Sequence, residues 1–121
     1  GDGSAMYSIQ ALWTAARHNF CWQFVISTNR SYKLLQLNIS QYWQEQGVEE
    51  RAFPLSFDLS RPAIDFAGLA HAQGVAAETI SKPEEIAPAI SRCLAHNGPY
   101  LLDVVIEGDT HPEMIGVRCG Q

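Results

Sequence analysis

The chain has 121 residues, of which 46% are hydrophobic and 17% charged, and its formal net charge at pH 7 is −5. This length is typical of one domain that can bury a core. The eight basic residues are scattered, and no apolar run approaches the ~18 residues of a membrane helix, which argues against nucleic-acid and membrane partners.

The N-terminal quarter is predicted to form a helix and a strand. Apolar residues recur at helical spacing over residues 4–18, and Ser4 is the expected N-cap. Residues 22–27 predict a strand, in which the run Phe24-Val25-Ile26 indicates burial on both faces, as in a parallel sheet.

The middle of the chain alternates between irregular and helical segments. A polar loop over 28–31 precedes a helix predicted over 32–46, with Leu34, Leu35 and Leu37 among its apolar residues. Residues 47–62 predict an irregular connection, because they contain two prolines. A short helix is expected over 63–73, and Gly74 should end it.

Two strands and a helix are predicted in the last third. A weak strand over 75–80 precedes Ser81-Lys82-Pro83-Glu84, whose Ser-x-x-Glu pattern predicts a capping box and a helix to about residue 96. The strongest predicted strand covers 100–106. Residues 107–121 show no periodicity and are expected to form a tail beyond a domain that covers 1–106.

Helices and strands therefore alternate along the chain. This order is typical of an α/β fold, a three-layer open parallel sheet with helices on both faces. The three cysteines are far apart, so neither a disulfide framework nor a zinc site is predicted, and reduced thiols favour a cytoplasmic protein.

The start of the chain carries a pattern suited to phosphate and metal binding. Gly1-Asp2-Gly3-Ser4 precedes the first predicted helix, where glycines allow close backbone approach and helix N–H groups attract phosphate. Asp2 offers a carboxylate, and Mg²⁺ in proteins takes one or two such oxygens together with substrate phosphates. Asn29 follows the next strand, and adjacent strand ends bring such loops to one edge of a parallel sheet.

This layout resembles the thiamine diphosphate (ThDP) motif, in which Gly-Asp-Gly is followed by Asn after a little under thirty residues. The resemblance implies that Asp2, Asn29 and the Ser31 carbonyl hold Mg²⁺. It also implies that the cofactor diphosphate lies against the remaining motif residues, which are Gly1, Gly3, Ser4 and Tyr32. Many members have two consecutive asparagines where this chain has Thr28-Asn29, and the matching ligand is the second.

The resemblance extends to about residue 106 and is closest to benzoylformate-decarboxylase-like enzymes. It is specific over the first 35 residues, and Gly98-Pro99-Tyr100-Leu101-Leu102-Asp103-Val104 is similar to the last strand of the family. A ThDP-dependent lyase acting on a 2-oxo acid, as decarboxylase or carboligase, is thereby implied. In the family the activating glutamate belongs to the pyrimidine-binding domain of a partner subunit, which implies a homo-oligomer.

Much of the family's machinery lies outside these residues, and the early strands of the diphosphate domain precede the motif. The chain is therefore expected to be part of a longer one and to be inactive by itself. Because no strand precedes Asp2 here to hold it, the site is expected to be poorly ordered or empty when the chain stands alone. We expect no catalytic residue in it, including the isolated His18, His71, His96 and His111. Leu34 and Leu35 either border the substrate, as the resemblance implies, or pack in the core.

Two alternatives remain open from sequence. The chain could be a non-catalytic fragment or an oligomerisation module. Within the enzymes, acetolactate-synthase-like and oxalyl-CoA-decarboxylase-like proteins share the motif, so the residues leave the 2-oxo acid and the reaction open.

Overall fold

The computed structural model describes residues 1–49 and 51–108. Its centre is a parallel sheet of three strands, β1 (Gln23–Thr28), β2 (Ala76–Ile80) and β3 (Tyr100–Val105). Their order is β1-β3-β2, so the last strand of the chain lies between the other two. The predicted strands are confirmed to within one residue at each end, and β1 extends by one residue to include Thr28.

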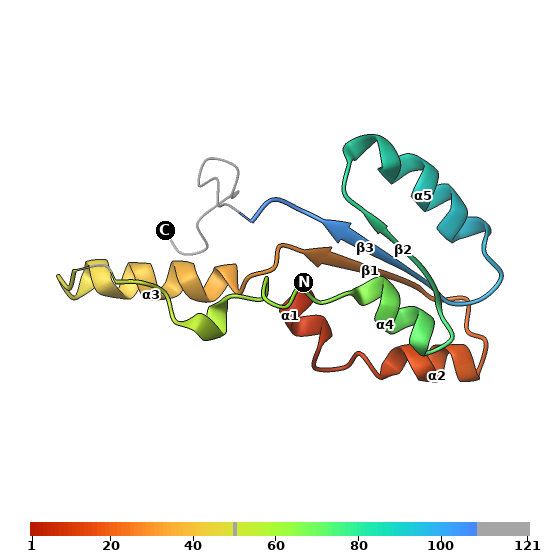
Figure 1. The fold of residues 1–121 in the computed structure, drawn as a ribbon, viewed down its shortest axis with the longest axis horizontal. Coiled ribbons are helices and arrows are strands. Elements are labelled where there is room, and N and C mark those ends of the chain that lie inside the picture. Colours follow the sequence, from red (N-terminus) through yellow and green to blue (C-terminus); the bar gives the residue numbers. More distant parts are fainter. Residues whose placement is uncertain (50, 109–121) are drawn as a thin grey trace, which may run out of the picture.

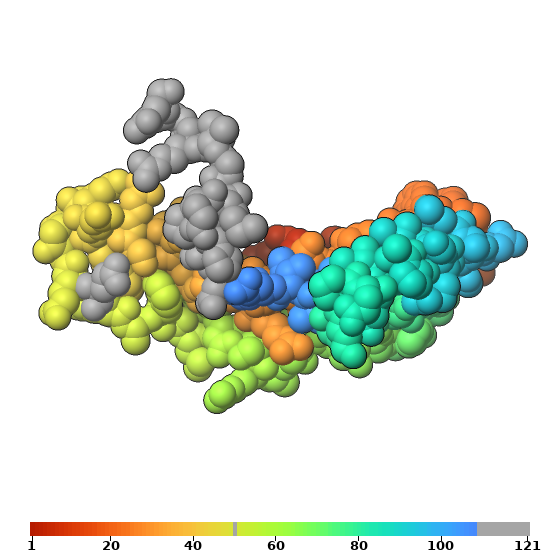
Figure 2. All heavy atoms as spheres, turned by 90° about the horizontal axis from the view of Figure 1, so that it is seen from above, coloured from red at the N-terminus to blue at the C-terminus, as the bar shows by residue number. Residues whose placement is uncertain are grey.

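Helices cover both faces of this sheet, which confirms the predicted three-layer α/β fold. They are α1 (Asp2–Ala5), α2 (Ala11–Arg17), α3 (Lys33–Glu45), the 3-10 helix η1 (Leu55–Phe57), α4 (Phe66–Ala72) and α5 (Pro83–Ala95). Helices α1, α2 and α4 lie below the sheet and α5 above it, whereas α3 projects beyond its end (Figure 1). Seen from above, α3 and α5 occupy opposite ends of the molecule (Figure 2). In the described ranges, no helix combines the length and the apolar character needed to cross a bilayer.

The hydrophobic core has two parts, one on each face of the sheet. The larger part is shared by α2, α4 and the strands, and consists of Leu12, Ile26, Phe66, Ala70, Val75 and Leu101. The smaller part lies under α5 and consists of Ile80, Ala89, Cys93 and Leu102. Because successive side chains of a strand point to opposite faces, the neighbours Leu101 and Leu102 on β3 serve different parts of the core.

The predicted burial of β1 on both faces is wrong. Ile26 is buried on the face covered by α2 and α4, but the side chain of Val25 is 64% exposed. The cause is the strand order, since β1 is an edge strand and α5 packs against β2 and β3. The apolar run Phe24-Val25-Ile26 therefore predicted a strand correctly but did not predict the position of that strand in the sheet.

The single helix predicted over 4–18 is two short helices joined by turns. Gly1, not Ser4, is the N-cap of α1, and Ser4 lies within that helix. Between the two helices the backbone bonds run from residue i to i−3, as in Tyr7 to Ser4 and Ala11 to Ser8. These tighter turns let Ile9 pack beside Leu12 on the sheet while the chain changes direction.

The capping box predicted from Ser81 and Glu84 is wrong, because the N-cap side chain makes no hydrogen bond and only the glutamate half of the motif is present, one residue later. Lys82 is the N-cap and Glu85, not Glu84, is the capping acid. The Glu85 carboxylate accepts from the backbone N–H groups of Ser81 at 3.0 Å and Lys82 at 3.1 Å, which lowers its pKa. Pro88 lies inside α5, which continues past it to Ala95.

The remaining helices agree with their predictions, except that α4 starts later than expected. The predicted helix over 63–73 begins only at Phe66, because the Asp65 carboxylate accepts from the N–H of Gly68 at 2.8 Å and caps it. Gly74 follows with a φ of 82°, a left-handed conformation that glycine adopts without strain and that ends the helix.

A charged group connects α5 with the two strands beneath it. Arg92 donates to Glu78 through Nε at 3.1 Å and Nη2 at 2.6 Å, and the Tyr100 hydroxyl donates to Glu78 at 2.9 Å. The hydrogen bonds from Arg92 are the main reason that the pKa of Glu78 is lowered, and the Tyr100 bond acts in the same direction.

Glu78→Gln should reduce the free energy of unfolding at pH 7 by about 1 kcal/mol, since the Arg92 side chain is 54% exposed and water screens the pair. A pKa lowered by folding stabilises the fold above the ordinary value of 4.5, and this contribution is lost as the pH falls through the lowered pKa. Urea unfolding of both proteins at pH 7 and at lower pH measures the difference, which should shrink below pH 4.5. A constant difference would contradict the electrostatic origin.

Candidate functional site

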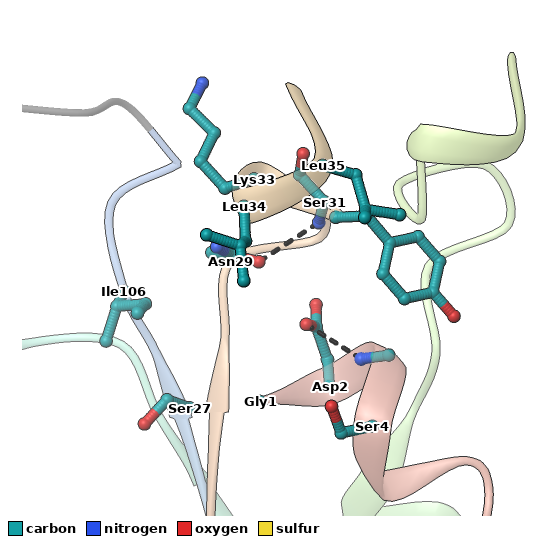
Figure 3. A pocket seen from close by; sticks show the side chains of 12 residues that line it. Gly1, Asp2, Ser4, Ser27, Asn29, Ser31, Lys33, Leu34, Leu35 and Ile106 are labelled. Carbon is teal, nitrogen blue, oxygen red and sulfur yellow. Dashed lines mark hydrogen bonds between the residues drawn. The ribbon is translucent and has the colours of Figure 1, made fainter. Parts of the chain in front are cut away.

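A cavity of about 410 Å³ opens at the carboxyl end of β1. All nine residues singled out in the sequence line it, which are Gly1, Asp2, Gly3, Ser4, Asn29, Ser31, Tyr32, Leu34 and Leu35. They come from α1, from the loop after β1 and from the first turn of α3 (Figure 3). The fold therefore joins the two halves of the motif, although Asn29 lies 27 positions after Asp2 in the sequence.

Asp2 connects α1 to the loop after β1. Its side chain is only 4% exposed. One carboxylate oxygen accepts from the N–H of Gly3 at 3.0 Å and the other from the N–H of Arg30 at 2.6 Å. Asp2 is therefore held by Gly3 and Arg30 although no strand precedes it. A carboxylate has about four acceptor positions, so two remain for a cation.

The loop after β1 has a conformation fixed by its own side chains. Arg30 has a φ of 57°, which for a residue other than glycine costs of the order of 1–3 kcal/mol. The Asn29 Oδ1 accepts from the N–H of Ser31 at 3.1 Å, two residues later, and forms an Asx turn. Together with the bond from Arg30 to Asp2, this turn keeps the Asn29 side chain on the cavity side (Figure 3).

Gly3 and Tyr32 depend on each other. A Cβ atom built on Gly3 would overlap the ring of Tyr32, so only glycine lets this ring lie against α1. The backbone N–H of Tyr32 donates to the carbonyl of Phe57 at 3.0 Å, which holds the start of α3. The cavity wall therefore has a fixed shape at the position where close backbone approach was predicted.

The donor atoms around the cavity suit a hard divalent cation. Asp2, Asn29 and Ser31 line the same cavity, and carboxylate, amide and carbonyl oxygens are the ligands that Mg²⁺ prefers. The Ser31 Oγ is buried and has no hydrogen-bond partner in the structure, which leaves a polar atom for a ligand to satisfy. Among residues 1–49 and 51–108 no cluster of three or more His, Cys, Asp or Glu could hold a metal.

One side of the cavity is apolar. The side chains of Leu34 and Leu35 are 69% and 42% exposed, so the alternative that they pack in the core is wrong. Ile106 completes this side from the residue after β3. Its backbone N–H donates to the carbonyl of Thr28 at 3.0 Å.

Three lining residues were not predicted, namely Ser27, Lys33 and Ile106. Ser27 and Lys33 flank the motif, and strand alternation could have indicated Ser27. Ile106 was inaccessible to sequence reasoning because its position depends on β3 lying beside β1.

None of the described histidines lines the cavity. His18, His71 and His96 are exposed and lie at or near the ends of helices α2, α4 and α5. His71 contacts the carbonyl of Ala77 at 3.1 Å. His111 lies outside the described residues, as does nearly all of the predicted tail.

Comparisons with known proteins agree with the resemblance read from the motif. Residues 1–104 match the family model described as "Thiamine pyrophosphate enzyme, C-terminal TPP binding domain". The "Putative acetolactate synthase large subunit IlvX" of Mycobacterium tuberculosis is 36% identical over 95% of this chain and 21% of its own length. The benzoylformate decarboxylase of Pseudomonas aeruginosa is 35% identical over 86% of this chain and 18% of its own length.

A solved structure supports the fold as well. The chain aligns with a thiamine diphosphate-dependent 4-hydroxybenzoylformate decarboxylase of Rhodococcus jostii with a TM-score of 0.76 and 31% identity. The alignment covers 90% of this chain and 19% of that one. The chain thus spans about a fifth of the length of the proteins it matches.

Proposed function

The chain belongs to the thiamine pyrophosphate enzymes, as part of their C-terminal TPP binding domain, and we propose that it anchors the diphosphate of ThDP through one Mg²⁺. The observation that carries this proposal is the buried Asp2 carboxylate, hydrogen-bonded to the loop that contains Asn29 and Ser31. A magnesium site needs several oxygens held in octahedral geometry, and this bond fixes the two halves of the motif relative to each other.

Each residue has a defined task in this proposal. Asp2, Asn29 and the Ser31 carbonyl hold the cation, which neutralises phosphate charge and orients the diphosphate. The backbone at Gly1 and Gly3, the Ser4 side chain and the Tyr32 ring line the space that the diphosphate takes.

The bound cofactor supplies the carbanion chemistry of the reaction, and the protein orients it. Leu34 and Leu35 present an apolar surface beside the site, which suits the side chain of a 2-oxo acid. No described residue is assigned a proton-transfer step.

The reaction that we propose is that of a 2-oxo-acid decarboxylase or carboligase of the benzoylformate decarboxylase type. The similar solved structure is a decarboxylase of this kind, and Leu34 and Leu35 would suit an aromatic side chain. We further propose a homo-oligomer in which a pyrimidine-binding domain of a partner subunit completes the site, in the cytoplasm. The two described cysteines are free, in agreement with a reducing compartment.

An acetolactate-synthase-like transferase is the second candidate, favoured by the 36% identity to an acetolactate synthase large subunit. Product analysis with benzoylformate and with pyruvate separates the two, since only the transferase condenses two pyruvate molecules. Absence of turnover in a longer protein that joins this chain to a pyrimidine-binding domain, with intact cofactor binding, would instead favour a non-catalytic or oligomerisation module.

Metal-dependent cofactor binding tests the proposal directly. Calorimetric titration of the purified protein with ThDP, in Mg²⁺ and in EDTA, should give at least roughly tenfold tighter binding with the metal, or about 1.4 kcal/mol. Thiamine without its diphosphate serves as the matched ligand control and should show no metal effect. Equal ThDP affinity in Mg²⁺ and EDTA would reject the proposed anchor.

A further inference from the structure

We propose that Thr28 and Asp103 are positioning residues, which set the place of Asn29 in the proposed magnesium site from inside the sheet. The inference rests on the proposed function and deepens it. Neither residue lines the cavity, and both are buried, with 4% and 3% exposed surface.

Asp103 is an acid in the middle of the hydrophobic sheet. It lies on the central strand β3, two residues after Leu101 and on the same face. One oxygen accepts from the Thr28 hydroxyl on β1, in a short hydrogen bond, and the other accepts from the Thr79 hydroxyl on β2 at 3.3 Å. This carboxylate therefore connects all three strands near their carboxyl ends.

Burial of the Asp103 carboxyl group, with two hydroxyl groups as its hydrogen-bond partners, costs free energy relative to an apolar side chain. Transfer of a polar group from water costs a few kcal/mol unless it is hydrogen-bonded, and a charged one more. In the described residues no Lys, Arg or His forms an ion pair with Asp103. Apolar side chains of the same shape in place of Asp103 and both threonines would be nearly neutral or stabilising. The arrangement is thus better explained by the geometry it imposes than by stability.

Thr28 connects the buried carboxylate of Asp103 to the candidate site. This residue is the last of β1 and is followed directly by Asn29. Its side chain is fixed by Asp103, and its carbonyl accepts from the N–H of Ile106 at 3.0 Å. With both its side chain and its backbone attached to β3, Thr28 gives the Asx turn a fixed starting point. Metal ligands need such support, because errors of about 0.5 Å in their placement weaken binding.

The chain contains its own matched control, because Thr79 donates to the same carboxylate from a strand that does not lead to Asn29. The Mg²⁺ affinity of the purified protein is measured by titrating the metal at a fixed ThDP concentration. Thr28→Val should weaken it roughly tenfold, whereas Thr79→Val should change it less than about twofold. Thr28→Ser restores the hydroxyl and should restore the affinity.

Controls for folding and the relative losses of Mg²⁺ affinity decide whether Thr28 is a positioning residue. Denaturant midpoints show whether the variants are folded, and Thr28→Ala replaces Thr28→Val if the added methyl group prevents folding. Equal losses of Mg²⁺ affinity for the Thr28 and Thr79 variants would show that the hydrogen bonds to Asp103 only support the fold, and would overturn the inference. Unchanged affinity in Thr28→Val would overturn it too, while leaving the proposed function intact. A wild-type protein that binds ThDP without any metal effect would overturn both.

Discussion

Asp2→Ala is expected to abolish the effect of Mg²⁺ on ThDP binding. Of the described residues that line the cavity, Asp2 alone is acidic, and the substitution also removes the bond from the N–H of Arg30 at 2.6 Å. Without its carboxylate ligand the cation is no longer held, so affinity in Mg²⁺ should fall by the full metal effect, at least roughly tenfold, to the value measured in EDTA. Calorimetric titration with ThDP in both conditions measures the change.

Two controls separate the loss of a ligand from a loss of local structure. Asp2→Asn keeps one acceptor oxygen but loses the charge, and should retain a weak metal effect. Asp65→Ala removes another helix-associated carboxylate, the N-cap of α4, and should cost about 1 kcal/mol of stability without changing the metal effect. Tight binding by Asp2→Ala with the full magnesium effect would disprove the assigned ligand.

Phe66→Ala is expected to give the largest loss of stability. Phe66 is fully buried where α4 meets the sheet, and it belongs to the larger part of the core. Truncation of a buried phenylalanine removes its transfer free energy and leaves a cavity, which together cost about 3–5 kcal/mol. Native domains are stable by only about 5–15 kcal/mol, so the variant should be unfolded or close to it.

Urea unfolding followed by circular dichroism gives the free energies. Leu94→Ala is the matched control, because this apolar side chain on α5 is 70% exposed and its loss should change stability by less than about 0.5 kcal/mol. A similar small effect for Phe66→Ala would show that α4 is not part of the cooperative core.

Local patterns in the sequence were sufficient for most of the fold. Helix α3 and the strands follow from periodicity, and Gly74 marks the end of α4 through its positive φ. The sequence pattern did not predict burial correctly where burial depends on which elements pack against a strand. Val25 looks like a core residue because its neighbours do, yet its exposure depends on which strands lie beside β1 and which face α5 covers.

Some residues of the candidate site could be predicted from the sequence, whereas the buried residues behind it could not. Asp2 and Asn29 could be recognised because each has a chemical reason to occur at its position, and Ser31 and Tyr32 followed from the resemblance. Thr28 and Asp103 could not, since they lie 75 residues apart and meet only when β3 is placed beside β1. Loop residues that carry chemistry are visible in a sequence, whereas the buried residues that support them look like ordinary strand residues.

Helix α3 stands away from the sheet and buries only Trp43, which stacks on Phe53 with ring centroids 5.9 Å apart. Its amide protons therefore depend on a small local opening free energy, whereas those of β3 depend on global unfolding. The cavity lies at the junction of these two regions, since Leu34 and Leu35 belong to the first turn of α3. ThDP binding should therefore slow amide hydrogen exchange in the first turns of α3, a helix whose amides otherwise exchange fast.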